Sequence, residues 1–167
     1  MKRFLSAIDT TNKWIGLGMA FLILAMIFMT GYEVISRFVF DAPTVWAHKI
    51  TAQVFGFYSI MAGGYVLLNK AHIRVDVFFN RLSSKGKAIA DLCTFTFAFL
   101  FVGALLFRAS SFAWESIKLM EHTYPPFPLL TFPLKSSMIL GISLLLLQLI
   151  AKYIRDLYLA ITGLEHV

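Results

Sequence analysis

Histidines and charged residues are the side chains of this sequence that could do chemistry, as ligands of haem or a metal ion or as carriers of protons and ions. His48 and His72 flank the second long apolar segment. A helix would place them roughly a membrane thickness apart, too far to ligate one haem. His48 and His122 are expected on the same side of a membrane, but one lies at an interface and the other in a loop. We therefore expect no metal or haem site.

Motifs of enzymes and of ion-coupled transporters are missing from the sequence. It has no Gly-rich phosphate loop, no H-E-x-x-H, no paired cysteines and no G-x-S-x-G. No acid or base falls clearly at the middle of an apolar segment, where a transporter that binds its own ions usually places one. No pair of half-helices broken by Gly or Pro marks a midplane substrate site. The chain is therefore expected to be no enzyme and to carry no transport site alone.

Four long apolar segments must position the functional residues of the chain. The 167 residues are 59% hydrophobic, with a mean hydropathy of +0.76. A helix of about 20 apolar residues crosses the roughly 30 Å of hydrocarbon in a bilayer. The sequence thus predicts an all-α integral membrane protein with four transmembrane helices in a single domain, residues 1–167. The predicted helices cover about residues 14–36, 46–68, 88–112 and 131–154.

The charges in the loops predict the orientation. Of the 15 basic residues, ten fall near the termini or between the second and third helices, and five fall on the other side. Because basic loops stay in the cytoplasm, both termini are expected there. This basic excess lies beside membrane segments, so it does not indicate a nucleic-acid partner. Residues 69–87 mix apolar and charged positions, which predicts a short interfacial amphipathic helix on the cytoplasmic surface.

The outer ends of the first two helices carry candidate interface residues. Glu33 and Arg37 are four residues apart with the acid first, which favours a helical ion pair, and Trp46 is typical of an interfacial anchor. Gln53 predicts a hydrogen bond, because an unpaired amide in hydrocarbon costs free energy. Small side chains let membrane helices approach closely, and four of them share one face of the second helix as a candidate seam: Ala52, Gly56, Ser59 and Gly63. Ser137 and Gly141 form another pair of small residues in the fourth helix. Two interpretations stay open for this seam, packing within the chain and contact with a larger partner.

Several motifs then occur in order and with short spacing. The most specific is His72-Ile73-Arg74-Val75-Asp76, directly after the second helix. It is preceded by Arg37-Phe38-Val39-Phe40-Asp41, Pro43, Trp46 and Gly63-Gly64. This pattern, strongest over residues 33–82, resembles the DctQ-type small membrane subunit of TRAP (tripartite ATP-independent periplasmic) transporters.

The resemblance implies a protein of the bacterial inner membrane that assists a larger one. In that family a large membrane subunit holds the substrate and sodium sites and moves them. A soluble periplasmic binding protein delivers an organic anion, often a carboxylate such as a C4-dicarboxylate or sialic acid. The small subunit binds the large one and enlarges its static part. The resemblance therefore implies that this chain holds no cofactor beyond bound phospholipid. It also implies that Na⁺ binds in the partner subunit and that no nucleic acid is a partner.

Interface roles follow for several residues. Arg37 is expected to bridge Glu33 and a lipid phosphate or the outer loop of the large subunit, or alternatively to snorkel as an ordinary membrane arginine. His72, Arg74 and Asp76 are expected to tie the end of the second helix to the surface helix or to the partner. The alternative for these three residues is contact with lipid headgroups alone.

The chain departs from the family at His48 and Lys49, where acidic residues are usual. This reversal of charge puts in doubt any contact there with a basic partner surface. Two other classes of protein stay open. One is a membrane anchor or assembly factor of a respiratory or other membrane enzyme, which an absorbance spectrum would reveal if it holds haem. The other is a small exporter working as a dimer, which transport by the chain alone would reveal.

Overall fold

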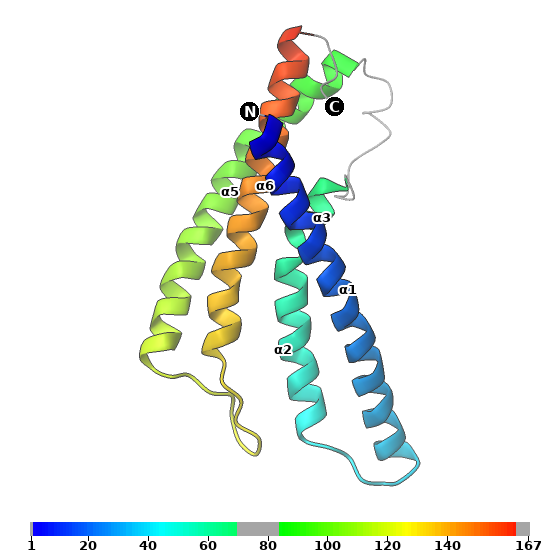
Figure 1. Cartoon of the computed structure of the whole chain (residues 1–167). Helices are drawn as coiled ribbons and strands as arrows, with labels where there is room; N and C mark the ends of the chain where they lie inside the picture. The colour runs from blue at the N-terminus through cyan, green and yellow to red at the C-terminus, as the bar shows by residue number, and fades with distance from the viewer. Residues whose placement is uncertain (1, 70–83, 163–167) are drawn as a thin grey trace.

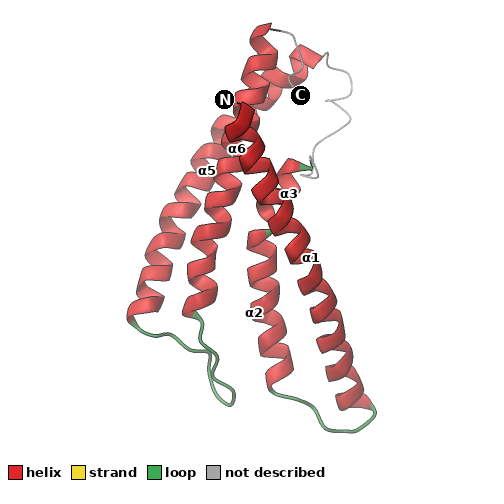
Figure 2. Ribbon diagram, viewed as in Figure 1, coloured by secondary structure: helices red, strands yellow, loops and turns green. Residues whose placement is uncertain are grey.

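The structure is a computed structural model of the chain that describes residues 2–69 and 84–162. The described residues form five helices, shown in Figures 1 and 2: α1 (Lys2–Phe38), α2 (Trp46–Met61), α3 (Gly63–Leu68), α5 (Ser84–Lys118) and α6 (Phe132–Thr162). Four helical segments are long and apolar enough to cross a membrane: Arg3–Phe38, Trp46–Leu68, Thr94–Lys118 and Phe132–Leu159. The predicted all-α fold with four membrane helices is confirmed.

The first helix begins earlier than predicted. Hydropathy places its start near residue 14, whereas α1 begins at Lys2 and is about 55 Å long at 1.5 Å per residue. Its first turns contain the polar residues Asp9 and Asn12, which precede the apolar segment and so set where that segment begins in the sequence. In the structure these turns pack on α6 through Leu5 and Ile8, which are buried against Ala151. Tertiary packing therefore extends the helix beyond its apolar part.

The second membrane segment consists of α2 and α3, which are separated only by Ala62. Backbone hydrogen bonds continue through this point, since Ala62 N donates to Tyr58 O (2.9 Å) and Val66 N donates to Ala62 O (3.0 Å). The break at Ala62 directly precedes Gly63-Gly64, and glycine pairs are a usual cause of a local bend in a helix. The two helices therefore act as one membrane segment.

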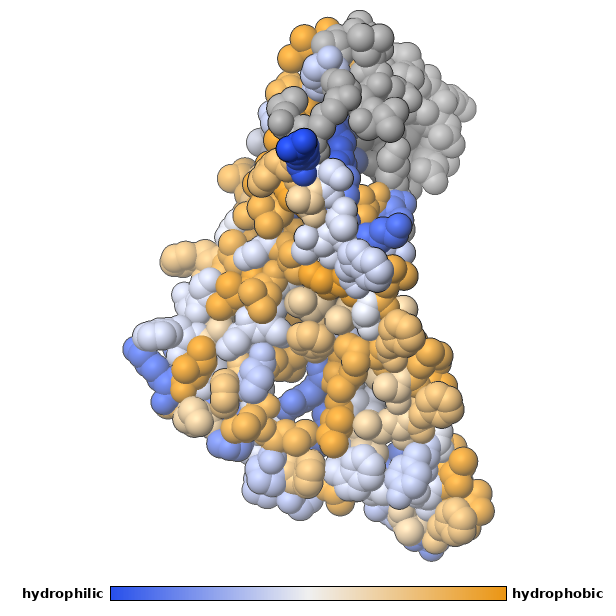
Figure 3. Space-filling model, viewed as in Figure 1, coloured by the Kyte–Doolittle hydropathy of each residue, from blue (hydrophilic) through white to orange (hydrophobic). Residues whose placement is uncertain are grey.

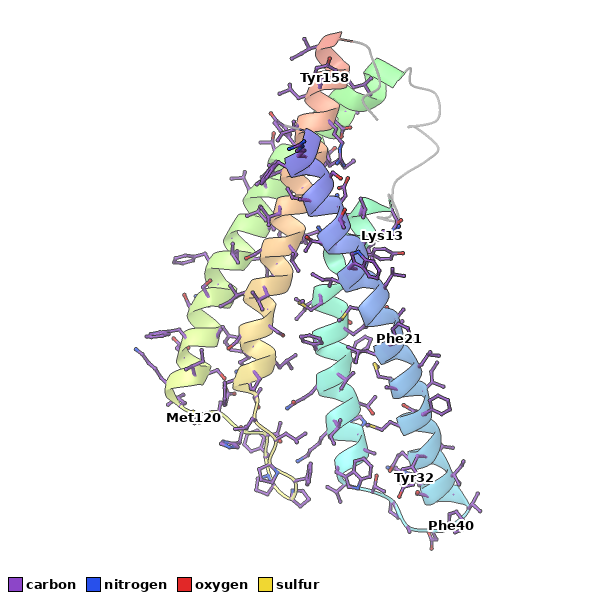
Figure 4. All side chains as sticks on the ribbon, viewed as in Figure 1. Lys13, Phe21, Tyr32, Phe40, Met120 and Tyr158 are labelled. Carbon is purple, nitrogen blue, oxygen red and sulfur yellow. The ribbon has the colours of Figure 1, made fainter. Side chains whose placement is uncertain are left out.

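The helices form two antiparallel pairs that meet at one end and diverge at the other. α6 contacts α1, α2, α3 and α5, and it is the most buried of the four membrane segments. The start of α1 and the end of α6 lie together at the top of Figure 1, whereas the α1–α2 and α5–α6 loops lie apart at the bottom. Figure 4 shows this separation through Phe40 in the first loop and Met120 in the second. We call the end with these two loops the loop end.

Most of the buried apolar residues in the described part of the chain form three small clusters, and each cluster includes a residue of α6. Besides the Leu5–Ile8–Ala151 cluster, Leu67 packs with Phe95 and Leu149, and Val102 and Ala109 pack with Ile142. Most large apolar side chains of α1 and α5 point outward instead, among them Phe21 and Phe28. Figure 3 shows apolar surface over both helix pairs. Such a surface suits hydrocarbon or a membrane partner, because water would make its exposure unfavourable.

Candidate functional site: a buried polar network and the interaction surfaces

The predicted Glu33–Arg37 ion pair is present at the loop end of α1. Arg37 Nη2 lies 2.7 Å from Glu33 Oε1, and Arg37 Nε donates to the same oxygen at 3.2 Å. The other carboxylate oxygen accepts hydrogen bonds from the backbone N–H (3.2 Å) and the hydroxyl of Thr44. Glu33 therefore fixes the α1–α2 loop, a contact that the sequence did not predict. The Arg37 side chain is 51% exposed, so it remains accessible to another group.

Trp46 lies at the start of α2, next to this ion pair. Its ring stacks on Tyr32 of α1, with the ring centroids 5.9 Å apart. Both rings are partly exposed. Aromatic residues of this kind gather where a membrane meets water, so the position suits the predicted interfacial role.

Of the small residues proposed as helix-contact positions, some lie between helices of this chain and others are exposed. A Cβ atom at Gly56 would lie 3.5 Å from Leu134, and one at Gly63 would lie 3.8 Å from Leu145, both on α6. A Cβ at Gly141 would lie 2.6 Å from Ile60 Cγ2 and 2.8 Å from Ile60 O. These three glycines thus face contacts between α6 and the second membrane segment, as the interpretation of packing within the chain requires. Ala52 and Ser59, in contrast, are exposed.

The α5–α6 loop is pinned to α2 by Lys49 and Gln53. The Lys49 ammonium donates hydrogen bonds to the carbonyl oxygens of Tyr124 and, at 3.1 Å, of Phe127. Gln53 Nε2 donates to Leu130 O at 3.3 Å, so the predicted hydrogen bond is present, with a loop carbonyl as acceptor. The Lys49 cation therefore has a use inside this chain. A cation at this position holds the loop through carbonyl groups, which an acidic residue could not bind.

A buried polar network links α1 to α6 near the opposite end of the bundle. Asp9 accepts hydrogen bonds from Gln148 Nε2 (2.9 Å) and from both terminal nitrogens of Arg155, at 2.5 and 3.3 Å. Asn12 Nδ2 donates to Gln148 Oε1 at 2.8 Å and to Ile8 O at 3.2 Å. Asn12 and Gln148 are each only 1% exposed. The bidentate pairing of Asp9 and Arg155 compensates the charge at the edge of the network.

Gly64 of α3 completes this network. A Cβ atom there would lie 2.1 Å from Asn12 Oδ1 and 2.8 Å from Asn12 Cγ, so only glycine leaves room for the Asn12 side chain. Asn12 Oδ1 is buried and accepts no hydrogen bond from the described part of the chain. Three helices therefore meet at one amide. The network therefore connects the two helix pairs through side chains of α1 and α6.

Sequence reasoning missed this network, although it left signals. Asp9 and Asn12 are three residues apart and so share one face of a helix. Gln148 interrupts the apolar part of the last segment, and Arg155 follows it after seven residues on the same face. What the sequence did not show is that the two faces meet.

Other predicted positions have a simpler outcome. His72, Arg74, Asp76 and most of the predicted surface helix lie outside the described residues. His48 and His122 are both exposed. Among residues 2–69 and 84–162, no group of three or more His, Cys, Asp and Glu side chains could hold a metal ion.

These features define a membrane protein with four spanning helices, in which polar groups of the described residues hold its own helices and loops together. The family model of tripartite ATP-independent periplasmic transporters, DctQ component, matches residues 12–158. The chain therefore belongs to this family, which confirms the resemblance found in the sequence: it is a small membrane subunit of a TRAP transporter.

A curated relative agrees with this assignment. The chain is 28% identical over 116 residues to the isethionate TRAP transporter permease protein DctMQ of Oleidesulfovibrio alaskensis. The match covers 65% of this chain and 16% of that protein. The chain therefore corresponds to a small part of a much longer permease.

Proposed function

We propose that this chain is the static helper of a large membrane subunit in a sodium-coupled transporter that receives organic anions from a periplasmic binding protein. In this proposal the large subunit holds the Na⁺ and substrate sites, and the chain enlarges the part of the complex that does not move. The location would be the inner membrane of a bacterium, with both termini in the cytoplasm.

The observation that carries the proposal is how the polar groups inside the bundle are used. Asp9, Asn12, Gln148 and Arg155 bind one another and so join α1 to α6. A subunit that moved ions would instead need polar groups free to bind and release them. Internal linkage together with broad exposed apolar surface suits a scaffold that buries this surface against another membrane protein.

The relative's name supports a large partner. It joins DctM and DctQ in one permease, of which the match to this chain covers 16%. We infer that this chain needs a separate or linked large subunit. The alternative of an anchor for a respiratory enzyme gains no support from the family to which the chain belongs.

The substrate class proposed here is an organic anion. Carboxylates such as C4-dicarboxylates or sialic acid are the first candidates from the family resemblance. The relative's name adds isethionate, which is a sulfonate, so the assay should include both kinds of anion.

Co-purification tests the proposal most directly. The tagged chain is extracted from native membranes in mild detergent, and the co-eluting proteins are identified by mass spectrometry. A stoichiometric, much larger membrane protein is expected. If the chain instead elutes alone or with a redox enzyme, the proposed function is wrong. If the large subunit does co-elute, uptake of the substrate into proteoliposomes should require both subunits, the binding protein and a Na⁺ gradient.

Two of the predicted interface roles can be tested in the same complex. Arg37→Ala should reduce complex yield or uptake if Arg37 bridges to the outer loop of the partner or to a lipid. Normal yield and uptake would leave only the snorkelling role. Reversal of the charge at Arg74 should weaken assembly if the motif after the second segment binds the partner.

A further inference from the structure

A cation on the outward face of α5 has no partner in the described part of the chain. Arg108 is exposed and lies well inside the membrane segment Thr94–Lys118, whereas the sequence predicted a helix ending near residue 112 with no charge at its middle. It makes no hydrogen bond, ion pair or ring contact with any residue that the structure describes. Its position is ten residues from Lys118, which is about 15 Å along the helix. Ionisable residues within membrane segments are costly, so they usually have a partner.

Snorkelling to lipid headgroups is unfavourable for Arg108. The exposed Trp114 marks the interface at the loop end of α5, and it lies six residues further along, about 9 Å. Because each Cα–Cβ bond in a helix tilts toward the N-terminus, the Arg108 side chain leaves the backbone away from that interface. The long side chain would have to turn back along the helix to reach a phosphate at the loop end.

Other charged groups near this part of α5 do not supply the missing partner. Glu115 is seven residues along the same face, about 10 Å away, and forms no ion pair with Arg108. Lys118 lies over the Trp114 ring, with Nζ 5.2 Å from the centroid. Lys135 of α6 pairs with Glu121. The neutralising group for Arg108 therefore has to come from outside the described chain.

Arg108 lies at the centre of one continuous exposed face of α5. Alternating steps of three and four residues give one continuous face, which we call the Arg108 face: Phe101, Ala104, Arg108, Ser111 and Glu115. All five residues are exposed. This spacing places the five side chains side by side along α5.

The Arg108 face differs from the surface beside it. Ala104 and Ser111 are small and lie one turn on either side of Arg108, and the Ser111 hydroxyl is already bound to Phe107 O at 3.3 Å. The neighbouring Phe97 and Phe107 are large and are 76% and 73% exposed. Small residues in a membrane let another backbone approach, which lipid does not require.

We propose that the Arg108 face packs against a helix of the large membrane subunit and that a carboxylate of this helix pairs with Arg108. This inference rests on the proposed function, because it names the surface through which the chain would bind its partner. The carboxylate compensates the desolvated guanidinium, and the small residues bring the two backbones close enough for a bidentate pair.

The first test compares charge variants in the complete complex. Arg108→Glu should reduce the large subunit recovered with the tagged chain by about tenfold or more, because it places two negative charges together. Arg108→Leu should also reduce recovery, and Arg108→Lys should retain part of it. Lys118→Glu is the matched control, since it reverses a charge on the same helix at the last residue of the membrane segment. Recovery with Arg108→Glu equal to that with Lys118→Glu would overturn the proposal.

Two further readouts separate this test from misfolding and from failure of the proposed function. Arg108 forms no hydrogen bond, ion pair or ring contact with the described residues, so Arg108→Leu should leave the thermal stability of the isolated chain unchanged or raised. Loss of recovery with normal stability is the expected combination, whereas loss of both would place Arg108 in the fold of the chain itself and overturn the proposal. If the wild-type chain recovers no large subunit, the proposed function fails before this comparison is made.

Photo-crosslinking tests the occupant of the face. A benzophenone side chain at Ser111 should form a product with the large subunit, and one at the equally outward Phe28 of α1 is the comparison. Products with phospholipid only at Ser111, or no stronger protein product there than at Phe28, would show that lipid covers the Arg108 face and would overturn the proposal.

Discussion

Replacing Gly64 with alanine should destabilise the chain through Asn12. The new Cβ would lie 2.1 Å from Asn12 Oδ1 and 2.8 Å from Asn12 Cγ, so one of the two helices must move. Asn12 cannot turn away freely, because its amide nitrogen is bound to Ile8 O and to Gln148. The clash is therefore with a side chain that is fixed at both of its hydrogen-bond donors.

The size of the effect follows from three contributions. Overpacking of a filled interior costs about 1–3 kcal/mol. If Asn12 is displaced, the Gln148 carbonyl oxygen loses its donor while buried, which costs about 1–3 kcal/mol more. Alanine in place of glycine in a helix returns about 0.5–1 kcal/mol. We therefore expect the Gly64→Ala variant to lose about 1–5 kcal/mol of the free energy of unfolding.

The assay is reversible unfolding of the purified chain in mixed micelles, followed by helical circular dichroism. Gly18→Ala is the matched control, because a Cβ atom at Gly18 has nothing within 4 Å. This control should be neutral or slightly stabilising. Equal free energies for the Gly64 and Gly18 variants would refute the reasoning.

A double-mutant cycle identifies the cause. Asn12→Ala removes the side chain that the new methyl group would meet, so Gly64→Ala should cost little in that background. The two changes should therefore be non-additive by about 0.5–3 kcal/mol. An unchanged cost of Gly64→Ala in the Asn12→Ala background would place the clash elsewhere and contradict the role of Asn12.

Three further predictions concern the ion pairs and the loop. Asp9→Asn removes the pairing with Arg155, which is about one-third exposed, and should cost about 1–3 kcal/mol in the same unfolding assay; no change would mean that the pair adds nothing. Lys49→Met should increase hydrogen exchange of the α5–α6 loop amides and leave the α1–α2 loop unchanged, because the loop loses two hydrogen bonds. The ammonium of Lys135, 2.5 Å from Glu121, holds the pKa of the Glu121 carboxyl below its ordinary value of 4.5. This pairing therefore stabilises the fold above about pH 4.5 and is lost as the pH falls through the lowered pKa. Glu121→Gln should flatten this part of the dependence of stability on pH, and an unchanged slope would contradict the assignment.

The hydropathy pattern along the sequence was sufficient to predict the four membrane helices. Burial of a segment in hydrocarbon depends on the sum of its own residues, so the four apolar segments were recognisable one by one. The Glu33–Arg37 pair was equally predictable, because both residues lie on one helix face four positions apart. The family motifs also lie within a short stretch of sequence, and the family match confirms the assignment drawn from them.

Only the tertiary structure decided how the polar residues are used. Asp9 and Asn12 precede the first predicted membrane helix, and Gln148 lies within the fourth. Their contacts join residues 136 to 146 positions apart in the sequence. Which helix faces meet depends on how all four helices pack, and no local pattern contains that information. The same reason applies to Lys49, whose carbonyl partners are 75 and 78 positions away, and to Gly64, which is required by the Asn12 side chain of another helix.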